Sequence, residues 1–142
     1  MTMNDFGRAF EFVKKWEGGY SDDPNDPGGE TKFGISKRSY PSLDIKNLTI
    51  DQARSIYYRD YWQASGCNHL RWPLSLVVFD SSVNHGVSWV FRILQRVGVS
   101  WETMIFERVK LYAHLANTNK KNRGFLLGWL NRIVDLYDLC VK

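Results

Sequence analysis

The sequence predicts a mainly α-helical domain that carries one irregular, glycine-rich loop close to its start. Apolar residues recur at spacings of three and four positions in several segments, as they do on the buried face of a helix. Residues 18–36, in contrast, contain five glycines and two prolines, a composition typical of a structured loop. With 142 residues, of which 44% are hydrophobic, the chain suits one compact domain.

The first helix is predicted over about residues 5–17. Its inward face consists of apolar residues at helical spacing, namely Phe6, Phe10 and Val13. Asn4 or Asp5 can cap its N-terminus, because a short polar side chain can accept a hydrogen bond from the first turn. Gly18 and Gly19 cannot usefully continue it, so we expect it to end near Glu17. A short β-hairpin is expected within residues 30–36 of the loop that follows.

Four further helices are predicted after this loop, and the first three lie before about residue 117. Thr49 and Gln52 form a capping box that opens a helix reaching about Trp62. Pro73 suits the first turn of the next, which should end or kink at residues 84–86 and should bury Leu76, Val77, Phe79, Asp80 and Val83. Ser100 can cap a helix to about Asn117, with Ile105, Val109 and Tyr112 inward.

The last predicted helix runs from about residue 123 to 138, with Leu126, Leu127, Leu130, Ile133, Val134 and Tyr137 inward.

The formal charge of +4 arises entirely in residues 107–142, which carry seven Lys and Arg against three Asp and Glu. Such a surface can attract polyanions, but a solvated face is the commoner role. We expect that role for Lys110, Lys120, Lys121, Arg123 and Arg132.

Metal and cofactor chemistry have no support in the sequence. The three histidines are scattered without ligand spacing, and Cys67 and Cys140 belong to no Cys/His pattern, so both are predicted to be free thiols. The longest apolar run, residues 74–79, is far too short for a membrane span. We therefore expect no metal, no cofactor and no stable membrane insertion.

Glu17 is the residue whose position first suggests chemistry. It follows the bulky Trp16 at the predicted end of a helix, where desolvation and the negative end of the helix dipole both favour a protonated carboxyl. A protonated carboxyl can donate a proton to a glycosidic oxygen. Asp26 and Thr31 follow on the turn-rich loop and could supply the second carboxylate that glycoside hydrolysis usually needs, together with a hydroxyl. The alternative is structural: Asp26 as an Asx turn and Glu17 as a solvated charge.

The same loop resembles the signature of the glycoside hydrolase 108 family of N-acetylmuramidases, which occur as phage endolysins and as bacterial enzymes that open the cell wall. The resemblance rests on residues 17–20, 26–29, 31 and 34–36. Residues 58–62 resemble the Tyr/Trp segment of the family, and residues 79–86 resemble its Phe-Asp-x-x-Val-Asn-x-Gly block. Residues 94–99 and 125–132 resemble the beginning and end of its C-terminal peptidoglycan-binding segment, which is abridged after Val99.

This resemblance implies a lysozyme-like fold and a muramidase that cleaves the β-1,4 bond between N-acetylmuramic acid and N-acetylglucosamine. Glu17 would be the general acid, and the order Glu17, Asp26, Thr31 is also similar to the Glu–Asp–Thr order of phage lysozymes. Residues 1–142 would form one compact domain, with a catalytic part in residues 1–90 and an abridged peptidoglycan-binding-like part in residues 91–142. The substrate-binding candidates are Tyr20, Tyr61, Trp62, Asn84 and His85, although a Tyr/Trp stripe is more often core and His85 more often a helix-end residue.

Other functions stay open at this point. A lytic transglycosylase also needs one acidic Glu, but it leaves an anhydro sugar. The alternatives from other classes are a non-catalytic wall-binding protein and a nucleic-acid-binding helical domain. We expect the protein to be a monomer whose partner is peptidoglycan and not nucleic acid.

The N-terminus has no basic region followed by an apolar run, so no secretory signal is predicted. We expect synthesis in the bacterial cytoplasm and action in the periplasm or wall, after holin-type release or dedicated export.

Overall fold

The computed structural model describes residues 4–142, which divide into one unit that ends at Asp60 and a second that spans residues 61–142. The first unit contains helix α1 (Asp5–Glu17), strands β1 (Thr31–Lys32) and β2 (Ile35–Ser36), and helix α2 (Ile50–Tyr57). A π-helical turn, η1 (Tyr58–Gln63), leads from the first unit into the second. The mainly α-helical class and the hairpin within residues 30–36 are both confirmed.

Local capping defines the helices of the first unit. The Asn4 side chain accepts a hydrogen bond from the Gly7 amide at 2.9 Å, and Gly18 ends α1 in a backbone conformation with a φ of 74°. At α2 the predicted capping box is present, because Thr49 and Gln52 each accept a hydrogen bond from the other's backbone amide. The core of this unit is formed mainly by apolar residues of the two helices, including Ala9, Phe10, Val13, Ala53 and Ile56.

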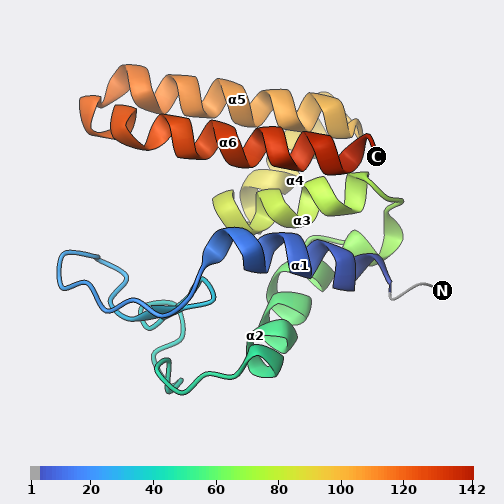
Figure 1. The fold of residues 1–142 in the computed structure, drawn as a ribbon. Helices are drawn as coiled ribbons and strands as arrows, with labels where there is room; N and C mark the ends of the chain where they lie inside the picture. The colour runs from blue at the N-terminus through green and yellow to red at the C-terminus, as the bar shows by residue number, and fades with distance from the viewer. Residues whose placement is uncertain (1–3) are drawn as a thin grey trace. The chain divides into compact units, whose positions relative to one another are not determined.

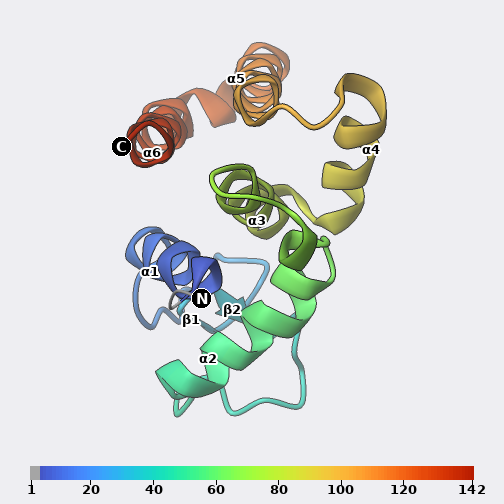
Figure 2. The same ribbon diagram turned by 90° about the vertical axis from the view of Figure 1, so that its right-hand side faces the viewer.

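The second unit contains the 3-10 turn η2 (Cys67–His69), helices α3 (Leu74–His85), α4 (Val87–Val97) and α5 (Trp101–Thr118), the 3-10 turn η3 (Lys120–Asn122) and helix α6 (Arg123–Cys140). Helices α5 and α6 form a long antiparallel hairpin (Figure 1), and Figure 2 shows the two nearly end-on, with α3 beside them. Gly86 ends α3 as predicted, and a further helix, α4, follows it without any corresponding prediction from the sequence.

The centre of the second unit is a buried ion triad formed by Asp80, Arg108 and Arg132. Asp80 on α3 lies 2.7 Å from the Arg108 Nη1 atom of α5 and 2.7 Å from the Arg132 Nη2 atom of α6. Asp80 and Arg108 are fully buried and Arg132 is nearly so. Burial disfavours a charged carboxylate, but the two guanidinium groups outweigh it and hold the pKa of Asp80 below its ordinary value. The triad therefore ties three helices together through charged hydrogen bonds.

This triad overturns two expectations about the C-terminal residues. Arg132 is not part of a solvated basic face, because it is buried against Asp80. The prediction of the inward face of α6 is also wrong in part. Three residues predicted to face inward are exposed, namely Leu127 (70%), Val134 (57%) and Tyr137 (47%). A helix turns by about 100° per residue, so placing Arg132 inside directs Leu127 and Val134 to the opposite side. Ile133 and Leu136 supply the apolar contacts of the buried face instead.

Both cysteines are free thiols, as predicted. Cys67 is buried, with its sulfur 3.2 Å from the Ser65 hydroxyl. Burial raises the pKa of Cys67 to about 12, although the Ser65 hydrogen bond opposes the shift. Burial also raises the pKa of Cys140 to about 12, and the charges of Asp80 and Glu102 act in the same direction. Both thiols therefore stay protonated at neutral pH.

We predict that Asp80→Ala destabilises the second unit strongly, because it leaves Arg108 and Arg132 buried without their carboxylate. Breaking one partner out of a buried charge group typically costs about 3–5 kcal/mol. Urea denaturation followed by circular dichroism measures the free energy of unfolding. Asp138→Asn on the exposed side of α6 is the control and should change it by less than about 0.5 kcal/mol. Equal stabilities of the two variants would contradict a structural role for the triad.

Candidate active site

Glu17 is the last residue of α1, and its side chain is half-buried. Gly18 and Gly19, which follow it, are exposed, and a Cβ atom on either glycine would meet no atom within 4 Å. The carboxyl group is therefore placed at a helix end beside open backbone, where a ligand can approach closely. This is the position that the sequence predicted for it.

The β-hairpin packs its turn against Glu17. Strands β1 and β2 pair antiparallel, with Lys32 opposite Ile35, so Phe33 and Gly34 form a two-residue turn with φ values of 52° and 80°. Two positive φ values identify the type I′ turn, which favours Gly at such positions. A Cβ atom at Gly34 would lie 3.0 Å from the Cβ and Cγ atoms of Glu17, so the bare glycine lets the turn approach the carboxyl-bearing side chain.

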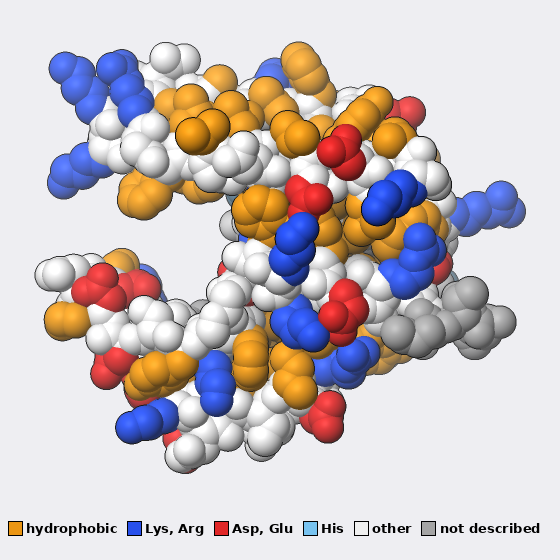
Figure 3. All heavy atoms as spheres, viewed as in Figure 1, with side chains coloured by type: hydrophobic (Ala, Val, Ile, Leu, Met, Phe, Trp, Pro, Cys, Tyr) orange, Lys and Arg blue, Asp and Glu red, His pale blue; other side chains and the backbone are white. Residues whose placement is uncertain are grey.

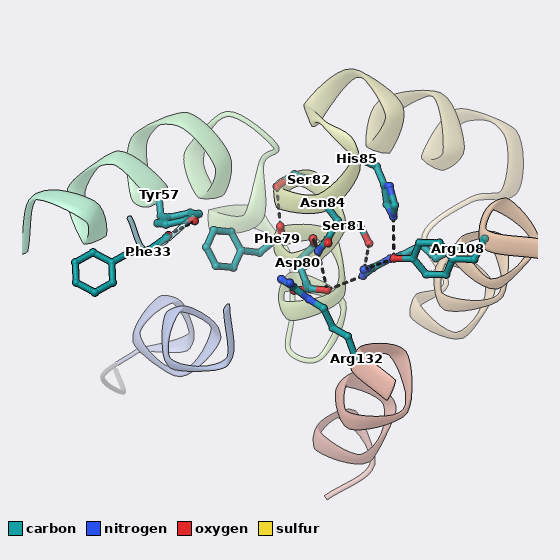
Figure 4. A network of polar contacts seen from close by, with 11 residues as sticks. Phe33, Tyr57, Phe79, Asp80, Ser81, Ser82, Asn84, His85, Arg108 and Arg132 are labelled. Carbon is teal, nitrogen blue, oxygen red and sulfur yellow. Dashed lines mark hydrogen bonds and ion pairs between the residues drawn. The ribbon is translucent and has the colours of Figure 1, made fainter. Parts of the chain in front are cut away.

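Tyr57 of α2 fixes this turn from the other side. Its hydroxyl donates a 2.6 Å hydrogen bond to the Phe33 carbonyl (Figure 4). A Cβ atom at Gly34 would also collide with that hydroxyl, because the space between the turn and Tyr57 is filled. Tyr57 is 2% exposed and packs on Phe10 of α1 with ring centroids 5.7 Å apart. Helix α2 therefore holds the hairpin turn in place beside the end of α1.

Thr31 and Tyr20 lie on adjacent backbone segments. Thr31 in β1 pairs with Ser21 through two backbone hydrogen bonds of 2.8 Å, which adds residue 21 to the edge of the hairpin. The neighbouring Tyr20 donates its hydroxyl to the Glu30 carboxylate at 2.6 Å, and its ring is 42% exposed. That hydrogen bond, with smaller contributions from burial and from the charges of Glu30 and Asp22, raises the pKa of Tyr20 to about 12.

Asp26 occupies an exposed turn and has a structural role there. Its Oδ1 atom accepts a 2.8 Å hydrogen bond from the Gly28 amide, and its carbonyl accepts a 3.0 Å hydrogen bond from the Gly29 amide. This is the Asx turn that the sequence offered as the structural alternative. The Gly28 carbonyl in turn accepts a hydrogen bond from the Arg38 amide at 3.2 Å, which connects the turn to the segment after β2. A catalytic role of Asp26 remains a prediction.

Asn84 and His85 lie at the C-terminal end of α3 in the second unit (Figure 4). The exposed Asn84 donates its amide to the Asp80 carbonyl at 2.8 Å. His85 places Nε2 3.2 Å from the Tyr112 hydroxyl, and its ring lies 4.9 Å from that of Trp89. Burial, aided by the charges of Arg108 and Arg132 and opposed by Asp80, lowers the pKa of His85 to about 4. The imidazole is therefore neutral at pH 7 and acts as a hydrogen-bonding group.

Tyr61 and Trp62, the two remaining predicted residues, start the second unit. Trp62 is 3% exposed, donates its indole N–H to Asn68 at 2.8 Å and packs edge-on against Phe79. Its ring is part of the core, which is the commoner role of such an aromatic residue. Tyr61 is half-buried, and its carbonyl accepts a hydrogen bond from the Ser65 hydroxyl.

Two residues that shape the first unit's site were not singled out from the sequence. Tyr57 fixes the hairpin turn and Glu30 binds Tyr20. The dipeptide Phe33-Gly34 between two short strand-like runs was the available signal for the turn. Tyr57, which binds the Phe33 carbonyl, lies 24 positions further along the chain, so no local pattern points to it.

Within residues 4–142, no group of three or more His, Cys, Asp or Glu side chains is placed to hold a metal ion. None of the helices in this range has the length and apolar character of a membrane span.

The fold is one that occurs in a solved structure. The structure of SagA from Brucella abortus matches with a TM-score of 0.77 at 23% sequence identity, and the match covers 96% of this chain and 93% of that chain. No match was found among curated proteins. At this level of identity the likeness to SagA concerns the fold alone.

Membership of a glycosidase family is shown by a match over more than half of the chain. Residues 10–86 match the model of the family described as glycosyl hydrolase 108, and the chain belongs to that family. The matched range includes Glu17 with its hairpin as well as the end of α3, and it confirms the resemblance noted in the sequence. Membership supports glycosidase activity on a glycan substrate and a peptidoglycan-hydrolase type of function.

We predict that Gly34→Ala reduces both stability and glycan cleavage. The positive φ alone should cost about 1–2 kcal/mol for a residue with a Cβ atom, and the new methyl group must also displace Glu17 or Tyr57. Gly29→Ala is a matched control, because its φ of 72° gives similar strain while its nearest contact would lie 3.9 Å away at Lys37. Both variants should unfold at lower urea concentrations, but only Gly34→Ala should lose activity in excess of its loss of folded protein.

Proposed function

We propose that this protein is an N-acetylmuramidase, which hydrolyses the β-1,4 bond between N-acetylmuramic acid and N-acetylglucosamine in peptidoglycan. The observation that carries the proposal is the placement of Glu17. It lies at the end of α1, beside two exposed glycines and against a hairpin turn, within the range that matches a glycosyl hydrolase family. A carboxyl group held in this way can protonate a leaving-group oxygen.

In this mechanism Glu17 donates its proton to the glycosidic oxygen as the bond breaks. The positive charge that develops on the sugar ring needs a water nucleophile or a stabilising carboxylate on the other side of the ring. Asp26 is the proposed group for that task, with Thr31 helping to position the water. Whether the anomeric configuration is retained or inverted depends on the separation of the two carboxyl groups in the substrate complex.

The proposed sugar-binding residues offer complementary chemistry. Tyr20 presents a partly exposed ring on which a sugar can stack. The exposed Asn84 amide can pair with the N-acetyl group of either sugar, because an amide both donates and accepts hydrogen bonds. The neutral His85 and the half-buried Tyr61 complete the proposed set.

The proposed setting is the bacterial cell envelope. The protein would be made in the cytoplasm and would reach the wall by holin-type release or by dedicated export. It would act as a monomer and as one domain, with a catalytic part in residues 1–90 and an abridged peptidoglycan-binding-like part in residues 91–142. A lytic transglycosylase is the enzymatic alternative, since it also uses one acidic Glu, and a non-catalytic wall-binding protein is the alternative without chemistry.

We predict that Glu17→Gln abolishes digestion of purified peptidoglycan while binding to it is retained. Loss of a general acid typically lowers the rate by about 10²–10⁴-fold. Glu11→Gln on the same helix is the control, because Glu11 is exposed and makes only surface ion pairs. Mass analysis of the fragments decides the reaction: new reducing ends indicate a hydrolase, and anhydro ends indicate a transglycosylase. An active Glu17→Gln variant would rule out Glu17 as the acid.

Asp26 has a structural and a proposed catalytic role, and two variants separate them. Asp26→Asn keeps an oxygen that can accept the Gly28 hydrogen bond but removes the charge, whereas Asp26→Ala removes both. We expect Asp26→Asn to retain its unfolding midpoint and to lose at least about tenfold in turnover, as expected when a charge that stabilises a transition state is removed. If Asp26→Asn keeps full turnover and only Asp26→Ala loses it, Asp26 has no catalytic role and acts only in the turn.

A further inference from the structure

Helix α6 has a second apolar face, on the side opposite its buried one. Five residues form this outer stripe, namely Leu127, Leu130, Val134, Tyr137 and, just after the helix, Val141. Leu130 is half-buried, and the other four are exposed. A helix that is apolar on both sides is expected to be covered on both sides, but within residues 4–142 only one side of α6 is covered.

The orientation of the outer stripe is fixed by contacts on the inner side of the helix. Arg132 binds Asp80 through its Nη2 atom at 2.7 Å. Val134 follows Arg132 by two positions, about 200° around the helix, so burial of the arginine directs the valine outward. The ring of Trp101 on α5 lies 5.8 Å from that of Tyr137 and orients it. The outer stripe is therefore ordered before any partner binds, which lowers the entropic cost of association.

The spacing of the outer stripe is that of a coiled-coil seam. Its residues follow one another at alternating intervals of three and four positions, which is the heptad repeat that packs against a second helix. From Leu127 to Tyr137 the intervals are three, four and three, so they are the same in either direction. A second copy of α6 that runs in the opposite direction therefore places apolar side chains opposite apolar ones. Leu127 meets the partner's Tyr137, and Leu130 meets the partner's Val134, as a self-complementary twofold interface requires.

The charges at the two ends of α6 favour the antiparallel arrangement. Within α6 the exposed charged residues are Arg123 in the first turn and Asp138 in the last. Arg123 donates its Nε hydrogen to the Ala116 carbonyl at 3.2 Å, and Lys120 and Lys121 add positive charge at the same end. Figure 3 shows a row of hydrophobic side chains along the α5–α6 hairpin and Lys and Arg side chains gathered where the hairpin turns.

An antiparallel pair brings Asp138 of each copy within about one helical turn of the partner's Arg123, whereas a parallel pair places like charges side by side. The helix dipoles also oppose each other only in the antiparallel pair. A lipid surface fits less well. Helices that lie on membranes carry mainly Lys and Arg beside their apolar face, but the outer stripe is flanked by the neutral Asn131 and the acidic Asp138.

We propose that two copies of this protein associate through their outer stripes, with the two α6 helices antiparallel about a twofold axis. Five side chains per copy form an interface below the standard size of about 800 Å² per partner, so we expect weak association, with a Kd on the order of 10⁻⁵ M. The dilute protein is then the monomer of the proposed function, and the dimer forms where the chain is concentrated. The inference is independent of the glycosidase activity, because Glu17 lies in the first unit and the outer stripe in the second.

Sedimentation equilibrium over about 1 µM to 1 mM tests the association. We expect a reversible monomer–dimer equilibrium for the wild type. Val134→Lys places a charge in the middle of both stripes and should weaken the dimer at least about tenfold. Phe91→Lys is the matched control, because it changes a 45% exposed apolar residue of α4 in the same way and should leave the Kd within about twofold. Circular dichroism establishes that both variants are folded.

A charge exchange tests the antiparallel arrangement. Arg123→Glu and Asp138→Arg should each weaken the dimer by roughly threefold, because each places like charges at both ends of the interface. The double variant should restore the wild-type Kd, since it re-forms both pairs with the signs reversed. A structural role of either residue within one chain would not produce this rescue. A double variant that associates no better than the single ones overturns the antiparallel pairing.

The remaining outcomes separate the possible occupants of the outer stripe. A wild type that stays monomeric over the whole range overturns the proposal, as does a Val134→Lys variant that associates as strongly as Phe91→Lys. Binding to phosphatidylglycerol vesicles that Val134→Lys abolishes, without any dimer, assigns the stripe to lipid and also overturns it. Digestion of peptidoglycan is measured on the same samples. A wild type that dimerises but does not digest peptidoglycan contradicts the proposed function alone, and one that digests without dimerising contradicts this inference alone.

Discussion

The carboxylate of Asp80 is the group on which most of the second unit depends. A charge in an apolar core is tolerated only when partners replace the water that it has lost, and here Arg108 and Arg132 do so from two other helices. Because each guanidinium comes from a different helix, the three helices are fixed in both rotation and register. The position of Tyr112, which accepts a hydrogen bond from Arg108, follows from that register, as does the position of Trp129, which stacks on Tyr112.

The first unit positions Glu17, the proposed general acid, in a different way. Glu17 ends a helix whose start is set by a local cap, but the surface beside it is built from a distant segment. The turn at Phe33 and Gly34 reaches the glutamate only because Gly34 lacks a Cβ atom, and Tyr57 holds the turn through its hydroxyl. The side chain of Glu17, the proposed general acid, is thus supported by a hydrogen-bonded turn, and preorganisation of this kind is what general acid catalysis requires.

Features with local causes were predictable from the sequence. The capped helix starts at Asn4, Thr49 and Ser100 and the hairpin within residues 30–36 all depend on neighbouring residues, and all are found. The rotation of α6 depends on an ion pair between residues 52 positions apart, and hydrophobic periodicity contains no information about it. For the same reason the sequence predicts Arg132 to be a surface charge. The position of Glu17 at the end of a helix was predictable because the glycine pair follows it, whereas its catalytic role and that of Asp26 remain predictions.

The two cysteines bear on how the fold is held together. Disulfide formation and most thiol oxidation begin from a thiolate, and burial keeps both Cys67 and Cys140 in the protonated form at neutral pH. The fold is held by apolar packing and by the Asp80 triad, and neither depends on redox conditions. The described fold therefore needs no disulfide for its stability, and neither thiol is poised to form one at neutral pH.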